Sequence, residues 1–130
     1  MKSNQGEKMI NQDEDTTVLY MEIAKDAIGQ EYLDSGADVE TEEETEHYAT
    51  MTLSAKEYYS IDELLLSMIK PCDVFIDAGE TSVMDNKYVQ KAKEMTLKFA
   101  EKHPETKTAC DKMIKMYDIA LKYGSSILFA

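Results

Sequence analysis

The stretch from residue 85 to residue 124 most strongly constrains the fold of this chain. Mainly apolar residues recur there at helical spacing on both sides of Pro104. Proline suits the first turn of a helix. Asp85 or Asn86 can cap the first helix, and Gly124 can end the second. We therefore predict an antiparallel helical hairpin. Its inward positions are Tyr88, Ala92, Met95, Thr96 and Phe99, then Ala109, Cys110, Met113, Ile114, Met116, Tyr117, Ala120 and Leu121.

The first helix of this hairpin also carries a stripe of lysines, which we place opposite its apolar face. Glu94 interrupts the stripe. Its members are Lys87, Lys91, Lys98 and Lys102.

Helical patterns are also predicted upstream. Tyr20, Ile23, Ala24, Ala27 and Ile28 recur at three-and-four spacing after Asp15, and "DSG" at 34–36 supplies an end. Thr41 with Glu44, and Ser60 with Glu63, match the capping-box pattern at the starts of two more helices. The resulting prediction is an all-α fold, a small bundle of four to five helices that ends in the hairpin.

An α+β fold is the alternative. The segment "YATMTLSA" alternates and contains threonines that favour strands, and "CDVFIDAG" fits a short strand as well as a helical turn. Short strands would then lie at about 48–54 and 73–77. The sequence thus does not decide between helix and strand at 47–55 and 72–79. In either fold we expect a flexible lead-in at 1–14 and a single domain at 15–130.

The final residues, "SSILFA", form an apolar tail. Such a tail most often docks onto its own core, and less often forms a strand or binds a partner. The nine methionines and eight tyrosines fall mostly on the apolar stripes, so we assign them mainly to core packing.

Charge is spread unevenly along the chain, whose net charge is −12. Residues 1–54 hold three lysines and fourteen acids (3 − 14 = −11), whereas residues 55–130 hold eleven lysines and twelve acids (11 − 12 = −1). Such asymmetry points to an interaction surface. All fourteen basic residues are lysine, and the lack of arginine argues against direct nucleic-acid binding.

The acidic run "ADVETEEETEHYA" is the candidate partner-binding site. We expect an acidic, non-catalytic binding protein that engages a basic and nucleic-acid-handling protein through carboxylates, because ordered carboxylates can occupy a phosphate-binding channel. Its role would be that of an inhibitor or nucleic-acid mimic of the phage or mobile-element type. The candidate residues are Asp34, Asp38, Glu40, Glu42, Glu43, Glu44 and Glu46.

A different function remains open. The chain could be a helical adaptor or regulatory subunit that binds through an apolar surface, namely the C-terminal hairpin and the tail. The acidity would then only serve solubility. Homo-oligomer formation also remains open.

Enzymatic chemistry finds little support. Glu44 and His47 form half of a di-iron pattern, but no second such pair exists. Cys72 and Cys110 lie in apolar surroundings and fit small buried residues better than metal ligands or nucleophiles. We therefore expect no catalytic residues, no metal site and no cofactor.

One segment does have a family likeness. Residues 74–82, "VFIDAGETS", resemble the first phosphate loop of actin and the sugar kinases. The resemblance implies a metal-side role for Asp77, a turn at Gly79, and phosphate contacts from Thr81 and Ser82. Glu80 departs from the pattern, because its charge would repel phosphate. A resemblance over nine of the 130 residues does not assign the chain to this family.

We expect a cytoplasmic protein without membrane contact. No stretch of the sequence approaches eighteen consecutive apolar residues, and the N-terminal residues lack the apolar centre of a signal peptide.

Overall fold

A computed structural model of the protein describes residues 14–36 and 42–130. Within these ranges the chain forms one five-stranded antiparallel sheet with the strand order β2-β3-β1-β5-β4. The strands are β1 Thr17–Ala24, β2 Glu43–Glu44, β3 Tyr48–Ser54, β4 Ser82–Met84 and β5 Ile127–Phe129. The helices are α2 Ala27–Asp34, α3 Ala55–Ser60, α4 Asp62–Ser67, α5 Val89–Lys102 and α6 Lys107–Tyr123, with short 3-10 turns at Asn86–Tyr88 and Pro104–Thr106.

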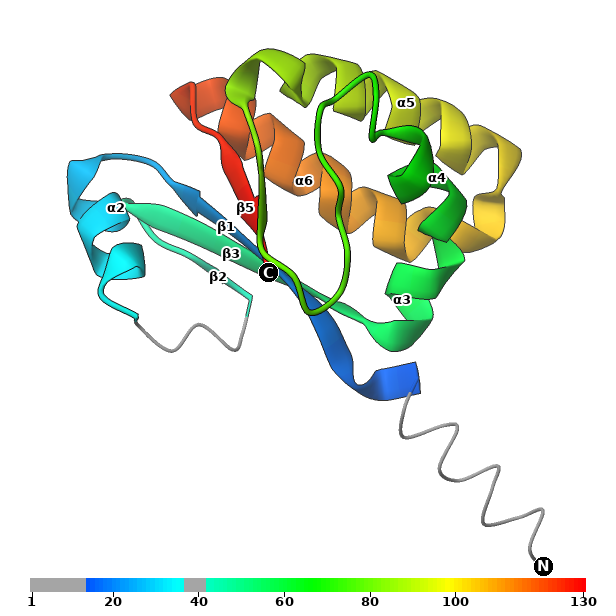
Figure 1. Ribbon diagram of the computed structural model, residues 1–130, viewed down its shortest axis with the longest axis horizontal. Helices are drawn as coiled ribbons and strands as arrows, with labels where there is room; N and C mark the ends of the chain where they lie inside the picture. Colours follow the sequence, from blue (N-terminus) through cyan, green and yellow to red (C-terminus); the bar gives the residue numbers. More distant parts are fainter. Residues whose placement is uncertain (1–13, 37–41) are drawn as a thin grey trace, which may run out of the picture.

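The prediction of an all-α helical bundle is wrong, and the α+β alternative describes the fold class correctly. Figure 1 shows α5 and α6 side by side on one side of the sheet, with α2 at the end of the sheet far from α3. The predicted lead-in at 1–14 lies almost entirely outside the described residues. No helix in the described ranges is long and apolar enough to span a bilayer.

The first predicted helix is replaced by β1, a tight corner and then α2. Along β1, Leu19, Met21 and Ile23 are buried beneath the helices and alternate with less buried neighbours. The two faces were hard to separate in the sequence because Val18 and Tyr20 also make the second face apolar. Asp26 caps α2, accepting a 2.8 Å hydrogen bond from the Gly29 amide.

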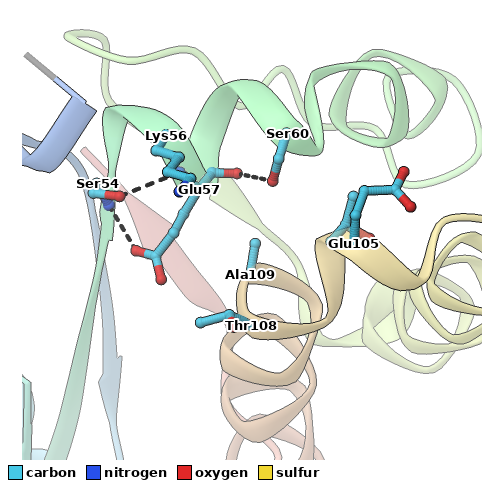
Figure 2. Close-up of a pocket in the computed structure, with 8 residues that line it drawn as sticks. Ser54, Lys56, Glu57, Ser60, Glu105, Thr108 and Ala109 are labelled. Atoms are coloured by element: carbon cyan, nitrogen blue, oxygen red, sulfur yellow. Dashed lines mark hydrogen bonds between the residues drawn. The ribbon is translucent and has the colours of Figure 1, made fainter. Parts of the chain in front are cut away.

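The second predicted helix is replaced by β2 and β3, which confirms the alternative strand at 48–54. The capping box does not form at Ser60 and Glu63. It forms at Ser54 and Glu57, where each side chain accepts a hydrogen bond from the other residue's amide (Figure 2). The capping box expected at Thr41 lies outside the described residues, and Glu44 is in a strand.

The alternative strand at 73–77 is wrong. Val74 and Ile76 are buried while Phe75 is half exposed, but these residues pair with no strand of the described sheet. The Tyr58 hydroxyl fixes this segment by accepting a 3.2 Å hydrogen bond from the Ala78 amide. Because no strand precedes Gly79, the likeness to a phosphate loop gains no support.

The helical hairpin is confirmed. Asp85 caps the 3-10 turn that leads into α5, Pro104 opens the turn before α6, and Gly124 ends α6 in the left-handed conformation with φ 64°. The buried face of α6 covers the sheet, and both cysteines lie fully buried in this layer as expected.

The apolar tail forms β5 and lies between β1 and β4. Ile127 and Phe129 are fully buried and face the helices, whereas Leu128 points to the opposite side of the sheet. The tail therefore belongs to the core.

Candidate functional site

The face of the sheet turned away from α5 and α6 carries the candidate site, and we call it the open face. Strand register places one residue from each strand in a single row across this face. In strand order the row is Glu43, Thr50, Glu22, Leu128 and Val83. Because neighbouring strands lie about 4.8 Å apart, Glu43 and Glu22 are about 10 Å apart along this row.

The predicted glutamate run divides between the two faces because successive strand residues point in opposite directions. Glu42 and Glu44 point to the helix side and form ion pairs. Glu42 lies 2.9 Å from Lys112 of α6, and Glu44 lies 3.2 Å from Lys25 and 3.9 Å from Lys115. Lysines of the same chain therefore offset the negative charge of these two carboxylates.

Glu43 points to the open face. Its carboxylate accepts a 2.8 Å hydrogen bond from the hydroxyl of Tyr48, and this bond raises the pKa of Tyr48 well above its usual range. The ring of Tyr48 stacks on Tyr32 of α2 at 4.9 Å between centroids. This contact fixes α2 against the open face.

Between α2 and the sheet lies a cavity of about 180 Å³. Its apolar walls come from α2 and three strands: Leu33, Ala24, Leu128 and Val83. Glu22 and Asp34 supply carboxylates, and Gln30 donates a 2.8 Å hydrogen bond to Asp34. Burial, with a further contribution from the charge of Asp34, raises the pKa of Glu22.

Several carboxylates on the open face and on α2 differ from Glu42 and Glu44, because no lysine of the described residues forms an ion pair with them. Glu22, Glu31, Asp34 and Glu43 form no ion pair with any lysine in the described ranges. Among the described residues, Asp26 and Glu46 form ion pairs with His47 alone. We call these six residues, Glu22, Asp26, Glu31, Asp34, Glu43 and Glu46, the acidic surface.

A histidine joins two members of this surface. His47 Nδ1 lies 2.6 Å from Asp26 Oδ2, and His47 Nε2 lies 3.2 Å from Glu46 Oε1. The hydrogen bond to Asp26 raises the pKa of His47, and the same bond lowers the pKa of Asp26. The pair joins the start of α2 to the turn before β3.

The stability that this pair contributes is expected to depend on pH. Because the pKa of His47 is raised above 6.5, its contribution is complete below that pH and is lost as the pH rises through the folded-state pKa. The lowered pKa of Asp26 sets the acid limit, since its contribution is lost as the pH falls through its own folded value. Asp26→Asn keeps an oxygen that can cap α2 but removes the charge.

An NMR titration of His47 checks this expectation. The pKa of His47 should lie above 6.5 in the wild type and fall towards 6.5 in Asp26→Asn. Urea unfolding should show a larger stability loss for the variant at pH 5.5 than at pH 8.5. Equal losses at both pH values would contradict the role of the ion pair.

A second cavity of about 400 Å³ lies between α3 and the start of α6 (Figure 2). Three of its polar residues, Ser54, Glu57 and Ser60, already have structural partners. Ser54 and Glu57 form the capping box, Ser60 donates a 2.7 Å hydrogen bond to the Glu57 carbonyl, and Glu57 also lies 3.1 Å from Lys112. The cavity presents no paired nucleophile and base.

Other catalytic arrangements find no support in the described residues. No group of three His, Cys, Asp or Glu side chains there could hold a metal ion. Burial raises the pKa of both Cys72 and Cys110, which disfavours the reactive thiolate form. The arrangement can bind cations by charge.

A comparison of the chain with protein-family models, curated proteins and solved structures finds no match. The functional argument therefore depends on the residues and their geometry.

The structure brings together only part of the predicted site. Glu43, Glu46 and Asp34 belong to the acidic surface, Glu42 and Glu44 point to the other side of the sheet, and Asp38 and Glu40 lie outside the described residues. The prediction missed three members: Glu22, Asp26 and Glu31. If "TVLYMEIA" is interpreted as a strand, the position of Glu22 between Met21 and Ile23 indicates that it faces away from the core.

Proposed function

We propose that this protein is an acidic, non-catalytic binding protein that engages a basic partner protein through the acidic surface. The observation that supports the proposal best is the contrast between the two sides of the sheet. On the helix side Glu42 and Glu44 are paired with lysines, whereas Glu22, Asp34 and Glu43 of the open face and Glu31 of α2 have no lysine partner in the described ranges. Unpaired carboxylates favour association with lysine- or arginine-rich surfaces.

The partner class is a basic and nucleic-acid-handling protein, and the activity is that of an inhibitor or nucleic-acid mimic. The described residues from 14 to 54 support this proposal with ten acids and one lysine (1 − 10 = −9). Direct nucleic-acid binding and membrane binding are not part of it. We also propose a cytoplasmic location, in keeping with two free, buried cysteines.

The alternative is a helical adaptor or regulatory subunit that binds through the apolar surface of the C-terminal hairpin and tail, and burial of the tail favours it less. Ile127 and Phe129 are fully buried in β5, and the methionines of α6 pack in the core. These side chains are inaccessible to a partner while the fold is intact.

Charge neutralisation with a matched control tests the proposal. The triple variant Glu31→Gln, Asp34→Asn and Glu43→Gln is expected to bind a fluorescein-labelled lysine decapeptide about tenfold more weakly, because each charge contact is worth roughly 0.5–1 kcal/mol. The matched triple variant Glu63→Gln, Glu80→Gln and Glu101→Gln changes the net charge equally but lies outside the acidic surface. It should retain most of the affinity.

Fluorescence anisotropy at two salt concentrations provides the measurement. The wild type should lose affinity as salt rises, and the open-face triple variant should show a weaker salt dependence. Equal weakening by both triple variants would mean that only net charge matters, and the proposed surface would be wrong.

A further inference from the structure

The groove between α4 and α5 lies outside the acidic surface and has the opposite charge. It has a volume of about 220 Å³. Its lining residues are Leu64 and Ser67 of α4 with Met95, Lys98, Phe99 and Lys102 of α5. The lining thus combines apolar side chains with two lysines that carry the only charges among these six residues.

The α5 residues of the groove form one continuous stripe. At about 100° per residue, Lys98, Phe99 and Lys102 lie within about 60° of Met95 around the helix axis. The acids Glu94 and Glu101 lie about 100–120° from Met95 on the same scale, beyond the lysines. The predicted lysine stripe therefore borders the apolar residues of the groove and does not lie opposite all of them.

Lys91 extends the positive edge towards the start of α5. At about 100° per residue it lies about 40° from Met95 around the helix axis, on the same side as Lys98 and Lys102. Lys91 and Lys102 are eleven positions apart, which corresponds to about 16 Å along a helix at 1.5 Å per residue. That length matches about three turns of a second helix.

The lysines of this edge differ from those that stabilise the fold. Lys25, Lys93, Lys107 and Lys112 each form an ion pair of 3.2 Å or less with a carboxylate. Lys91, Lys98 and Lys102 form none with the described residues. An occupant of the groove would need to bring its own carboxylates.

We propose that the α4–α5 groove binds an acidic amphipathic helix of a partner protein. Apolar side chains of that helix pack against the partly exposed Met95 and Phe99, above the buried Leu64, and its carboxylates meet the three lysines. This is a helix-in-groove mode of recognition, in which anchors at i, i+3 and i+4 fill the groove. A nucleic acid would satisfy the lysines, but it has no aliphatic side chains to pack against Met95.

The probe is a fluorescein-labelled synthetic helix of 18 residues with leucine and phenylalanine on one face and glutamate elsewhere. Two control peptides accompany it, one with the same residues shuffled so that no apolar face forms, and one with lysine in place of glutamate. Full-length protein should bind the probe, measured by fluorescence anisotropy, and bind both controls at least tenfold more weakly. Equal binding of the shuffled peptide would overturn the proposal.

Variants locate the binding site. Lys98→Glu with Lys102→Glu should weaken binding of the probe about tenfold or more, whereas the matched pair Lys56→Glu with Lys122→Glu should have a much smaller effect. Ser67→Tyr fills the groove without changing charge and should also abolish binding. Thermal unfolding of each variant establishes that the fold is intact, and Ser67→Tyr keeps the test valid if the charge reversal unfolds the protein.

NMR mapping and competition complete the test. The methyl resonances of Leu64 and Met95 should shift on addition of the probe, and shifts confined to the open face of the sheet would overturn the proposal. A twelve-nucleotide single-stranded DNA should compete poorly. If the DNA binds the same lysines more tightly than the peptide does, the partner class is wrong.

Discussion

Replacing Phe129 with alanine is expected to lower the free energy of unfolding by about 3–5 kcal/mol, which is the range for deletion of a fully buried aromatic ring. Phe129 has no exposed surface and lies in β5, which pairs with β1 on one side and β4 on the other. The cavity left by its ring would lie beneath the helices and at the junction of three strands. A change of this size is a large fraction of the total stability of a domain.

Leu128→Ala is the matched control for this prediction. Leu128 is the neighbouring residue in β5, but its side chain is only partly buried and faces the open side of the sheet. Leu128→Ala should lower the free energy of unfolding by about 1 kcal/mol, because the substitution removes less buried apolar area. Urea unfolding of both variants provides the comparison, and similar costs would mean that β5 is not packed as described.

Gly29→Ala is expected to destabilise the protein by about 3 kcal/mol or more, although the same change in an exposed helix interior usually stabilises by about 1 kcal/mol. The sign is reversed because a Cβ on Gly29 would lie 1.8 Å from the carbonyl oxygen of His47. That oxygen accepts a 2.8 Å hydrogen bond from the Lys25 amide, so it cannot move freely. The backbone of α2 would have to leave the sheet.

Gln30→Ala controls for the helix itself, because Gln30 is the next residue of α2 and is exposed. It should change stability by less than about 0.5 kcal/mol. Thermal unfolding distinguishes the two, and the stacking of Tyr32 on Tyr48 offers a local signal in the aromatic circular dichroism. A stable Gly29→Ala variant with normal aromatic signal would show that α2 does not approach the β2–β3 turn this closely.

Local signals in the sequence were sufficient for the C-terminal hairpin. Capping by Asp85, the position of Pro104 and the end at Gly124 all agree with the apolar spacing of α5 and α6. In this segment the hydrophobic pattern and the capping residues point to the same structure, which is when sequence-based prediction is most dependable.

The sheet could not be predicted in the same way because its strands carry apolar residues on both faces. In β1, the apolar residues Val18 and Tyr20 lie between the buried residues of the strand, and a register shift between Thr17 and Leu19 leaves Val18 packed against the core, so no clean alternation marks the strand. Three of the five strands have only two or three residues. Such short strands depend on their neighbours and leave almost no periodic signal.

The candidate site was located only in part for a related reason. The density of glutamates drew attention to the right segment, but a helix would have spread their charges around its axis. In the strand β2 the same residues separate by alternation, so Glu43 joins the open face and Glu44 pairs with lysines. Glu22 comes from a different strand, and only strand register brings it into the same row.

The position of β5 also sets an order of events during synthesis. Glu22 and Leu128 are paired although they are 106 positions apart in the chain (128 − 22). While the ribosome is still making α6, β1 can pair with β3, and β3 with β2, but the other edge of β1 must wait for β5. Strand β4 waits too, because it joins the sheet only through β5. The nascent protein therefore exposes an unpaired edge of β1 for most of its synthesis, and completion of the sheet should be a late folding step.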